Sequence, residues 1–265
     1  MIVKTIDSDM LQKYDVDISV VMTTYSGARY LRAQIDSIIS ELNTDDELLI
    51  SDDRSSDKTL EILSEYASDQ VRFIQTPGQL GPIRNFEHAL AQARGRVIVL
   101  SDQDDVWLAG RLSVVREHFS RDTMPYDLLV LDSDIVDGDL KPTQGSLFEL
   151  LYAGPGLIKN VVRNTYVGCH MAFRRELLDV AMPFPRAIPM HDVWLGLVSE
   201  SLGPVTFKPG ATMLFRRSGD NYTQSRYSTI QRLTWRIGLM TSLVQLRLST
   251  RFRERSNNGT AEKVT

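Results

Sequence analysis

Short apolar runs alternate with amphipathic stretches over the first half of the chain. The runs that have the composition of buried strands lie at 18–23, 48–50, 71–74, 97–100 and 128–131. Between them, apolar residues recur at helical spacing, which predicts helices at 28–41, from a cap at 55–57 to about residue 66, at 85–93 and at 111–119. This alternation predicts an α/β fold with a largely parallel central sheet and helices on both faces.

The pattern is less regular after residue 140, where glycine and proline punctuate 138–156 and 182–189. The sequence shows no internal repeat and no linker between two domains, so we expect residues 1–224 to form one domain whose second half covers the edge of the sheet. Residues 225–265 are predicted to form a basic amphipathic helix over about 228–255 and a polar tail that we expect to be disordered.

The predicted C-terminal helix has two different faces. Its apolar face holds Ile230, Leu233, Ile237, Met240, Val244 and Leu248. Its arginines recur at four-residue spacing and share a broad polar face, with Arg232, Arg236, Arg247, Arg251 and Arg255. Such a helix binds a membrane surface, or packs on the body of the protein or on a second subunit, and the pattern leaves both interpretations open.

Charge is distributed unevenly along the chain. Residues 225–265 contain eight Lys and Arg against two Glu, a net charge of +6, so the total charge of −4 leaves −10 on residues 1–224. A strongly acidic body argues against nucleic acid as the main partner. The composition, with 42% hydrophobic and 24% charged residues, is that of an ordinary globular protein.

The sequence also bears on the compartment. Cys169 is the single cysteine, so no disulfide can form within the chain and a reducing compartment is compatible. No apolar run approaches the roughly 20 residues that span a bilayer, and the first residues lack the apolar centre of a signal peptide. We therefore expect a cytoplasmic protein, located peripherally at the inner face of the cell membrane if its C-terminal helix binds lipid.

Three carboxylates follow the run at 97–100 within four positions: Asp102, Asp104 and Asp105. Like charges this close repel one another, and burying them unpaired is costly, so such a cluster at a strand end favours a bound cation. Asp102 and Asp104 offer oxygen ligands suited to Mg²⁺ or Mn²⁺, and the phosphates of a substrate could complete the shell. A solvated acidic turn is the alternative, and it is the commoner one for an isolated D-x-D pattern.

Polar residues also follow the first two predicted strands, with Thr24 and Tyr25 after the first and Asp52 and Asp53 after the second. Ligands of parallel sheets bind beyond the carboxyl ends of the strands, so we expect these residues and the acids at 102–105 to converge on one edge. The sequence contains neither a glycine-rich dinucleotide fingerprint nor a P-loop. Phosphates would therefore be held by a metal and by side chains.

An ordered set of segments resembles the family 2 glycosyltransferases: ISVVMTTYSGARYLRAQIDSI, LLISDDRSSDKT, GPIRNFEHAL, VIVLSDQDDVWLAGRL, TYVGCHMAF and MHDVWL. The resemblance covers roughly residues 17–224. The SDQDDVW variant with a later HDVW is most similar to the bacterial rhamnosyltransferase-type members, which act in surface-polysaccharide assembly. The family implies a GT-A fold, a nucleotide-sugar donor, Mn²⁺ or Mg²⁺ and inversion at the anomeric carbon.

The resemblance also assigns roles on the donor side of the site. It places Thr24 and Tyr25 in the nucleotide pocket and Asp52, with Asp53 beside it, at the base. Asp102 and Asp104 match the D-x-D motif, with Asp104 as the first choice for a direct metal ligand, and Gly168 and Cys169 match a small-residue turn flanking the donor sugar. From the residues alone, Asp52 and Asp53 could instead end a strand, and Cys169 is more often a packing residue than a nucleophile.

On the acceptor side, Asp192 falls where the family has its catalytic base, and His191 stands in place of an acidic neighbour. Asp192 could equally cap the helix that follows it, and the two roles are compatible because a helix N-terminus holds a carboxylate in its charged form. His191 is interpreted as a positioning residue. Trp194 packs on an acceptor sugar or lies in the core.

Asn85 contacts the nucleotide or caps its own helix, and Arg216 is the best candidate for a cation that binds the diphosphate. Relatives of this type often have histidine where this chain has Ser218. A histidine there can complete the metal shell, so Ser218 puts the metal affinity in doubt, with Asp220 or water as substitutes.

These observations lead to two hypotheses. The first is an inverting, metal-dependent enzyme that moves a single sugar, from dTDP-rhamnose or alternatively from a UDP- or GDP-sugar, onto a saccharide or lipid-linked acceptor. Single transfer is favoured because the Q-x-x-R-W signature of processive synthases is absent. The second is a non-catalytic nucleotide-sugar-binding homologue that acts as an assembly partner.

Overall fold

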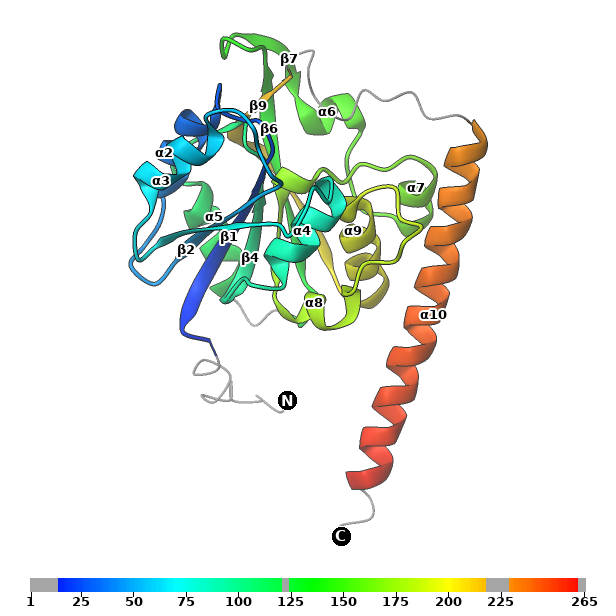
Figure 1. The fold of residues 1–265 in the computed structure, drawn as a ribbon. Coiled ribbons are helices and arrows are strands. Elements are labelled where there is room, and N and C mark those ends of the chain that lie inside the picture. Colours follow the sequence, from blue (N-terminus) through cyan, green and yellow to red (C-terminus); the bar gives the residue numbers. More distant parts are fainter. Residues whose placement is uncertain (1–13, 121–123, 218–228, 262–265) are drawn as a thin grey trace.

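The computed structural model describes residues 14–120, 124–217 and 229–261, and within these one mixed sheet organises the fold (Figure 1). The strand order is β3-β2-β1-β4-β8-β6-β9-β5, and β7 pairs with β6. The strands are β1 (Val16–Thr24), β2 (Glu47–Asp52), β3 (Val71–Gln75), β4 (Gly95–Ser101), β5 (Val106–Trp107), β6 (Leu128–Val136), β7 (Pro142–Ser146), β8 (Met171–Arg174) and β9 (Val205–Arg216). The helices are α2 (Leu31–Ile39), α3 (Thr59–Tyr66), α4 (Pro82–Leu90), α5 (Arg111–Ser120), α6 (Leu147–Leu151), α7 (Leu157–Val162), α8 (Glu176–Ala181), α9 (His191–Leu202) and α10 (Thr229–Ala261).

The first four strands are parallel, as the alternating pattern predicts. β1 lies between β2 and β4, and β3 pairs with the outer side of β2. The strand expected at 128–131 is β6, but it does not pair with β4. The later strand β8 inserts between them and runs antiparallel to both. The sheet is therefore mixed, because a buried four-residue strand from the second half of the chain joins its centre.

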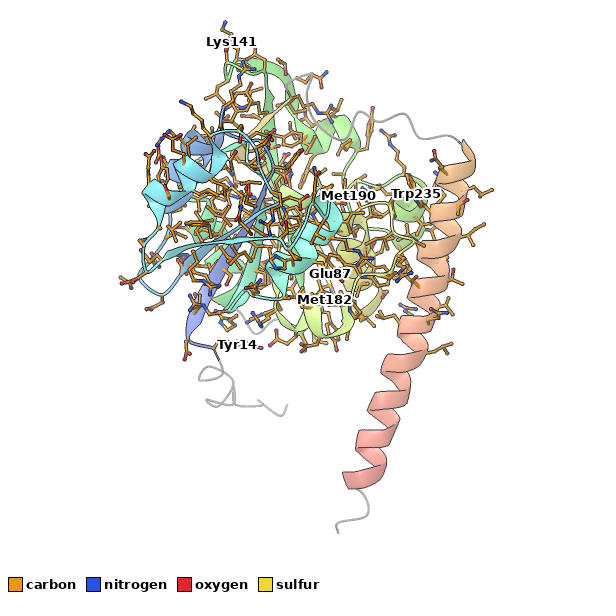
Figure 2. The ribbon with its side chains drawn as sticks, in the orientation of Figure 1. Tyr14, Glu87, Lys141, Met182, Met190 and Trp235 are labelled. Carbon is orange, nitrogen blue, oxygen red and sulfur yellow. The ribbon has the colours of Figure 1, made fainter. Side chains whose placement is uncertain are left out.

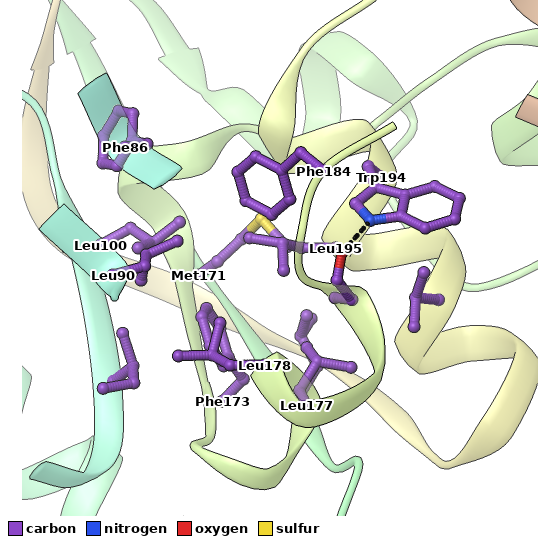
Figure 3. Packing of buried hydrophobic residues seen from close by; sticks show 14 of the residues in the cluster. Phe86, Leu90, Leu100, Met171, Phe173, Leu177, Leu178, Phe184, Trp194 and Leu195 are labelled. Atoms are coloured by element: carbon purple, nitrogen blue, oxygen red, sulfur yellow. Dashed lines mark hydrogen bonds between the residues drawn. The ribbon is translucent and has the colours of Figure 1, made fainter. Parts of the chain in front are cut away.

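Side chains alternate between the two faces of this sheet, so two clusters of buried residues form. Val21, Leu49 and Ile98 point into the cluster covered by α4, α8 and α9. Val20, Leu48 and Val99 point into the cluster covered by α2, α3 and α5. The central strands β1, β2 and β4 are buried on both faces, which explains why their runs are continuously apolar in the sequence. Figure 3 shows part of the first cluster. The predicted covering of both faces by helices is confirmed.

Helix boundaries differ from the sequence prediction by a few residues. The helix expected at 85–93 is α4 and begins at Pro82. Gly81 ends the preceding loop at φ +77°, a conformation that favours glycine, and Pro82 starts the helix where its missing N–H costs nothing. The short strands β5 and β7 and the long strand β9 are absent from the prediction, because their sequences lack an apolar run.

The predicted C-terminal helix is confirmed as α10, and it is longer than expected, since it continues to Ala261 instead of ending near residue 255. It lies against α7 and α9 and then extends beyond the body of the protein (Figure 1). Leu239 and Leu243 are buried in the first cluster, and Gly238 lies so close to Ala187 that a Cβ there would be 2.8 Å from the alanine Cβ. Among the described residues, no helix combines the length and the apolar composition needed to cross a bilayer.

Candidate functional site

The carboxyl ends of β1, β2 and β4 meet at one edge of the sheet, as expected for parallel strands. Thr24 is level with Asp52, and Met22 is level with Ser101, in the strand registers. The backbone N–H of Asp53 donates to the Thr24 carbonyl (2.9 Å). The acid loop, residues 102–105, follows β4 at this edge. The structure therefore brings together the strand-end residues that are far apart in the sequence.

Asp52 and Asp53 hold the loops that frame the edge. Asp52 is fully buried, and its carboxylate accepts hydrogen bonds from the hydroxyls of Thr24 (3.1 Å) and Ser55 (2.5 Å). The carboxylate of Asp53 accepts hydrogen bonds from the backbone N–H groups of Leu80 (2.7 Å) and Gly81 (2.8 Å). Asp53 thus fixes the entrance to α4, and Asp52 ties the end of β1 to the loop before α3. That they also contact a nucleotide stays a prediction.

Tyr25 and Asn85 also lie at this edge. Tyr25 is half-exposed, and its backbone N–H and carbonyl are both bonded to the amide of Gln103 in the acid loop (2.9 and 3.2 Å). Asn85 is buried, and its amide donates to the carbonyl of Ser51 (3.1 Å). Its Oδ1 atom has no hydrogen-bond partner among the described residues. Gln103 was not identified from the sequence, because a glutamine between two aspartates carries no recognisable signal.

Arg216 stabilises the acid loop through hydrogen bonds from its backbone and its side chain. Its backbone N–H donates to Asp105 (3.0 Å), and its side chain donates to the carbonyls of Asp104 (2.6 Å) and Gly138 (2.5 Å). The guanidinium also lies 4.2 Å from the ring centroid of Tyr30. The residue is almost fully buried in this arrangement. Its position therefore explains the shape of the acid loop, and contact with a diphosphate stays a prediction.

The candidate metal ligands are grouped differently from the sequence prediction. One potential ligand atom from each of Asp102, Asp105 and Cys169 lies within 4.8 Å of the others, whereas the predicted pair was Asp102 and Asp104. Asp105 is buried, and its Oδ2 atom has no hydrogen-bond partner in the part of the chain that the structure describes. An unpartnered buried carboxylate oxygen beside two further acids fits a cation. Asp104 as a direct metal ligand stays a prediction, as do Mn²⁺ and Mg²⁺.

The electrostatics of the acid loop support this interpretation. Burial, with a further contribution from Asp192, raises the pKa of Asp102 to about 6. Burial and the neighbouring Asp102 raise the pKa of Asp104 to about 7, and burial raises that of Asp105 well above its ordinary value. Acids in this situation take up protons or bind a cation. Ser218, which stands where relatives often have a metal-binding histidine, and Asp220, its predicted substitute, lie outside the described residues.

Asp192 lies at the start of α9 and faces the turn that contains Gly168. Its carboxylate accepts hydrogen bonds from the backbone N–H groups of Gly168 (3.1 Å) and Val193 (2.6 Å). Burial raises its pKa to about 6, and these hydrogen bonds partly offset the increase. Gly168 is followed by Cys169, whose sulfur lies within 4.8 Å of oxygens of Asp102 and Asp105, so Asp192 and the acid loop flank the same turn. The helix-start position and a catalytic role are therefore compatible, as the sequence indicates.

His191 stacks on Phe86 of α4, with ring centroids 3.9 Å apart. Burial lowers its pKa to about 3, so the imidazole is neutral at physiological pH. Neither ring nitrogen has a hydrogen-bond partner among the residues described. A Cβ at position 168 would lie 2.8 Å from the Nε2 atom of His191, so Gly168 is required for this close approach. These contacts agree with a positioning role for His191, which stays a prediction.

Of the two interpretations that the sequence left open for Trp194, the structure supports a position in the core. Trp194 is only 2% exposed, and its indole N–H donates to the carbonyl of Ala181 (2.8 Å) within the first cluster, as Figure 3 shows. It is a core residue, because its position in α9 turns it towards α8. Cys169 is also fully buried, behind Asp102 and Asp105, so it lies beneath the site and not on its surface.

An open pocket of about 210 Å³ lies between the start of α4 and the loop that leads into α9. Residues 80–84 and 185–190 line it. The two walls are tied together by Glu87, whose carboxylate accepts from the backbone N–H of Phe184 (2.6 Å). Figure 2 shows Glu87, Met182 and Met190 around this junction. The lining loop leads directly into the start of α9, where Asp192 lies.

Arg111 supports the acid loop and was not identified from the sequence. It is fully buried, donates to the carbonyl of Cys169 (2.7 Å) and the hydroxyl of Thr212 (2.6 Å), and lies 4.8 Å from the ring centroid of Trp107. The charge of Asp105 acts on it favourably. Its sequence position, at the start of an ordinary amphipathic helix, gives no hint of this role.

We expect Arg111→Met to lower the free energy of unfolding by about 3–5 kcal/mol, because it leaves buried acceptors and a buried carboxylate uncompensated. Urea unfolding followed by circular dichroism measures the change. Arg29→Met is the matched control: Arg29 also lies 4.8 Å from an aromatic centroid, that of Tyr30, but it is exposed, so its loss should cost less than about 1 kcal/mol. Equal effects of the two substitutions would contradict this role.

Comparisons with known proteins agree with this geometry. Residues 19–181 match the family model described as "Glycosyl transferase family 2". An uncharacterized glycosyltransferase of Nostoc is 30% identical over 176 residues, which cover 63% of this chain and 53% of that protein. The UDP-Glc:alpha-D-GlcNAc-diphosphoundecaprenol beta-1,3-glucosyltransferase of Escherichia coli is 30% identical over 100 residues, which cover 38% of this chain and 40% of that protein. The chain thus spans about half the length of these relatives.

Solved structures show the same fold. S. aureus TarS, residues 1–349 in complex with UDP-GlcNAc, superposes with a TM-score of 0.66 at 20% sequence identity. The superposition covers 80% of this chain and 62% of the TarS chain. GalNAc-T7, solved with UDP, GalNAc and Mn²⁺, superposes with a TM-score of 0.58 at 15% sequence identity. The superposition covers 77% of this chain and 44% of the GalNAc-T7 chain. The GT-A fold implied by the resemblance is confirmed.

Proposed function

Because the chain belongs to glycosyl transferase family 2, we propose that it is an inverting glycosyltransferase that moves a single sugar from a nucleotide donor to an acceptor hydroxyl. One observation carries the proposal. Asp192 lies next to the acid loop, across the Gly168 turn, at the edge where β1, β2 and β4 end. A base and a candidate cation site in one place are what in-line displacement of a nucleoside diphosphate needs.

The residues of the chain divide this chemistry between them. Asp192 takes the proton from the acceptor hydroxyl as that oxygen attacks the anomeric carbon. The Gly168 and Val193 N–H groups keep its carboxylate oriented, and the neutral ring of His191 packs behind it. A divalent cation, when bound by the acid loop, supplies positive charge for the leaving diphosphate. Residues Asp102, Asp105 and Asp104 are the candidates for holding it.

We propose dTDP-rhamnose as the donor, on the resemblance of SDQDDVW and HDVW to the rhamnosyltransferase-type members, with UDP- and GDP-sugars as alternatives. TarS binds UDP-GlcNAc in its solved complex, which supports a nucleotide-sugar donor in general. For the acceptor we propose a saccharide or a lipid-linked saccharide in bacterial surface-polysaccharide synthesis. The E. coli relative, named for a diphosphoundecaprenol-linked acceptor, supports the lipid-linked form. With a lipid-linked acceptor, we propose a cytoplasmic location at the inner face of the membrane.

Isothermal titration with dTDP, UDP and GDP, each with and without Mn²⁺, tests the donor site of the full-length chain. We expect one of the three to bind at least about tenfold more tightly with Mn²⁺ present, because an ion held by the acid loop would attract the diphosphate. ADP serves as the matched control for nonspecific diphosphate binding. Tight binding that is unaffected by Mn²⁺ would contradict the metal site, and no binding of any nucleotide would contradict the donor site.

A further inference from the structure

One helix presents two apolar stripes, and only one of them is used inside the protein. α10 packs against α7 and α9 through Leu239 and Leu243. The residues of its other stripe recur at intervals of three and four and are 45–62% exposed: Leu233, Ile237, Met240, Val244 and Leu248. These are members of the apolar face that the sequence predicted. The helix is therefore docked on the body, and its predicted apolar face remains outside.

Apolar side chains are also exposed on the neighbouring helix α7 and in the loop before it. Ile158 on α7 is 81% exposed, and Val162 and Tyr152 beside it are also exposed. Arg236 of α10 donates to the carbonyl of Val162 (2.5 Å), so the two helices are joined at this point. We call the α10 stripe together with Tyr152, Ile158 and Val162 the outer apolar face. No sequence pattern linked its two parts, which are more than 70 residues apart.

Cations surround the outer apolar face. Lys159 and Arg163 are exposed on the α7 side, and residues 150–165 contain no acidic residue. Arg236 and Arg247 are exposed on α10, which contains six Arg and one Glu in all. A groove of about 440 Å³ runs along the face and is lined by Arg236, Ile237, Met240, Thr241 and Val244. A row of large exposed apolar side chains bordered by cations marks an interaction surface.

We propose that the outer apolar face binds the surface of an anionic lipid bilayer, with α7 and α10 lying in the interface together. An apolar stripe bordered by cations is the arrangement that inserts between lipid headgroups. Pairing with a second copy is less suited, because the same arginines would meet across the contact and repel one another. This inference deepens the proposed function by naming the membrane partner, and it includes α7, which the sequence did not implicate.

Flotation of the full-length chain with phosphatidylcholine vesicles, with and without phosphatidylglycerol, tests the proposal. We expect binding only to the anionic vesicles, and binding that weakens as salt is added. Val244→Glu should lower the partition coefficient about tenfold, and so should Ile158→Glu. Gln245→Glu is the matched control: it adds the same charge one residue away, at an exposed position outside the stripe, and should bind as the wild type does.

Each other result overturns the proposal or part of it. If the wild type does not bind anionic vesicles, the membrane is not the partner. A dimer in light scattering that Val244→Glu dissociates, without vesicle binding, would assign the face to a second copy. If Val244→Glu weakens vesicle binding and Ile158→Glu does not, α7 takes no part in membrane contact. Vesicle binding needs neither donor nor acceptor, so its outcome is independent of whether the protein transfers a sugar.

Discussion

Replacing Asp192 with asparagine is expected to lower kcat for sugar transfer by about 10²- to 10⁴-fold, while the affinity for the nucleoside diphosphate stays unchanged. The amide keeps the size of the side chain and can still accept one of the two backbone hydrogen bonds from Gly168 and Val193. It cannot accept a proton from the acceptor hydroxyl. Single-turnover transfer assays and nucleotide titration, on the same protein preparation, separate these two effects.

The raised pKa of Asp192 also predicts how kcat depends on pH. Burial raises that pKa to about 6, so the carboxylate is deprotonated and able to act as a base only above that pH. In the wild type, kcat should therefore rise as the pH increases through about 6 and level off above it. Asp192→Asn should lose this acid limb together with its rate.

Asp179→Asn is the control for this experiment, because Asp179 is exposed on α8 and its loss should leave the rate unchanged. An Asp192→Asn protein that transfers sugar at the wild-type rate would remove Asp192 from the chemistry. A wild type that binds the donor but transfers nothing, with every acceptor tested, would favour the non-catalytic binding homologue instead.

The second large effect is expected at the acid loop. Asp104→Asn should lower kcat/KM by about 10²- to 10³-fold, since a bound cation contributes several kcal/mol to stabilising the leaving diphosphate. The variant should also lose the Mn²⁺ dependence of nucleotide binding. Titration of the nucleotide with and without Mn²⁺ measures the second effect directly. Asp69→Asn, at an exposed position after α3, is the control.

Stability against pH gives an independent test of the same loop. The pKa values of Asp102 and Asp104 are raised to about 6 and 7, so the folded protein binds more protons than the unfolded chain between about pH 4 and 7. The metal-free protein should therefore lose stability as the pH rises through this range. Asp104→Asn should reduce the loss, and Mn²⁺ should reverse it in the wild type. A melting temperature that is flat with pH would contradict the raised pKa values.

The acid loop illustrates how far sequence reasoning reached into the site. Asp102, Asp104 and Asp105 were recognisable because three acids within four positions after a buried strand have a high free energy without a cation. The sequence did not indicate which potential ligand atoms lie close to one another. The structure groups Asp102 and Asp105 with Cys169, because β8 inserts beside β4 and carries the preceding turn under the loop. Pairing between strands that are distant in the sequence has no local signal.

Trp194 and Arg216 show the same limit for single residues. A tryptophan after His-Asp-Val is compatible with a substrate surface or a core, and only the contact of α9 with α8 placed it in the core. For Arg216 the sequence indicated a cation that binds a diphosphate, which stays a prediction, and only the structure shows that its side chain donates to the carbonyls of Asp104 and Gly138. In both cases the residue type indicated an interaction, and the tertiary structure determined the partner.

The sequence by itself determined the class of fold and the succession of β1 to β4 along the chain, because apolar periodicity is a local property. It also indicated the family, through an ordered set of segments. It also determined that α10 is a basic helix with an apolar face. Only the tertiary structure decided which stripe of α10 is buried, since Leu239 and Leu243 meet α9 while Leu233 and Val244 remain exposed. That choice depends on the surfaces available on α7 and α9, and a single helix sequence does not contain them.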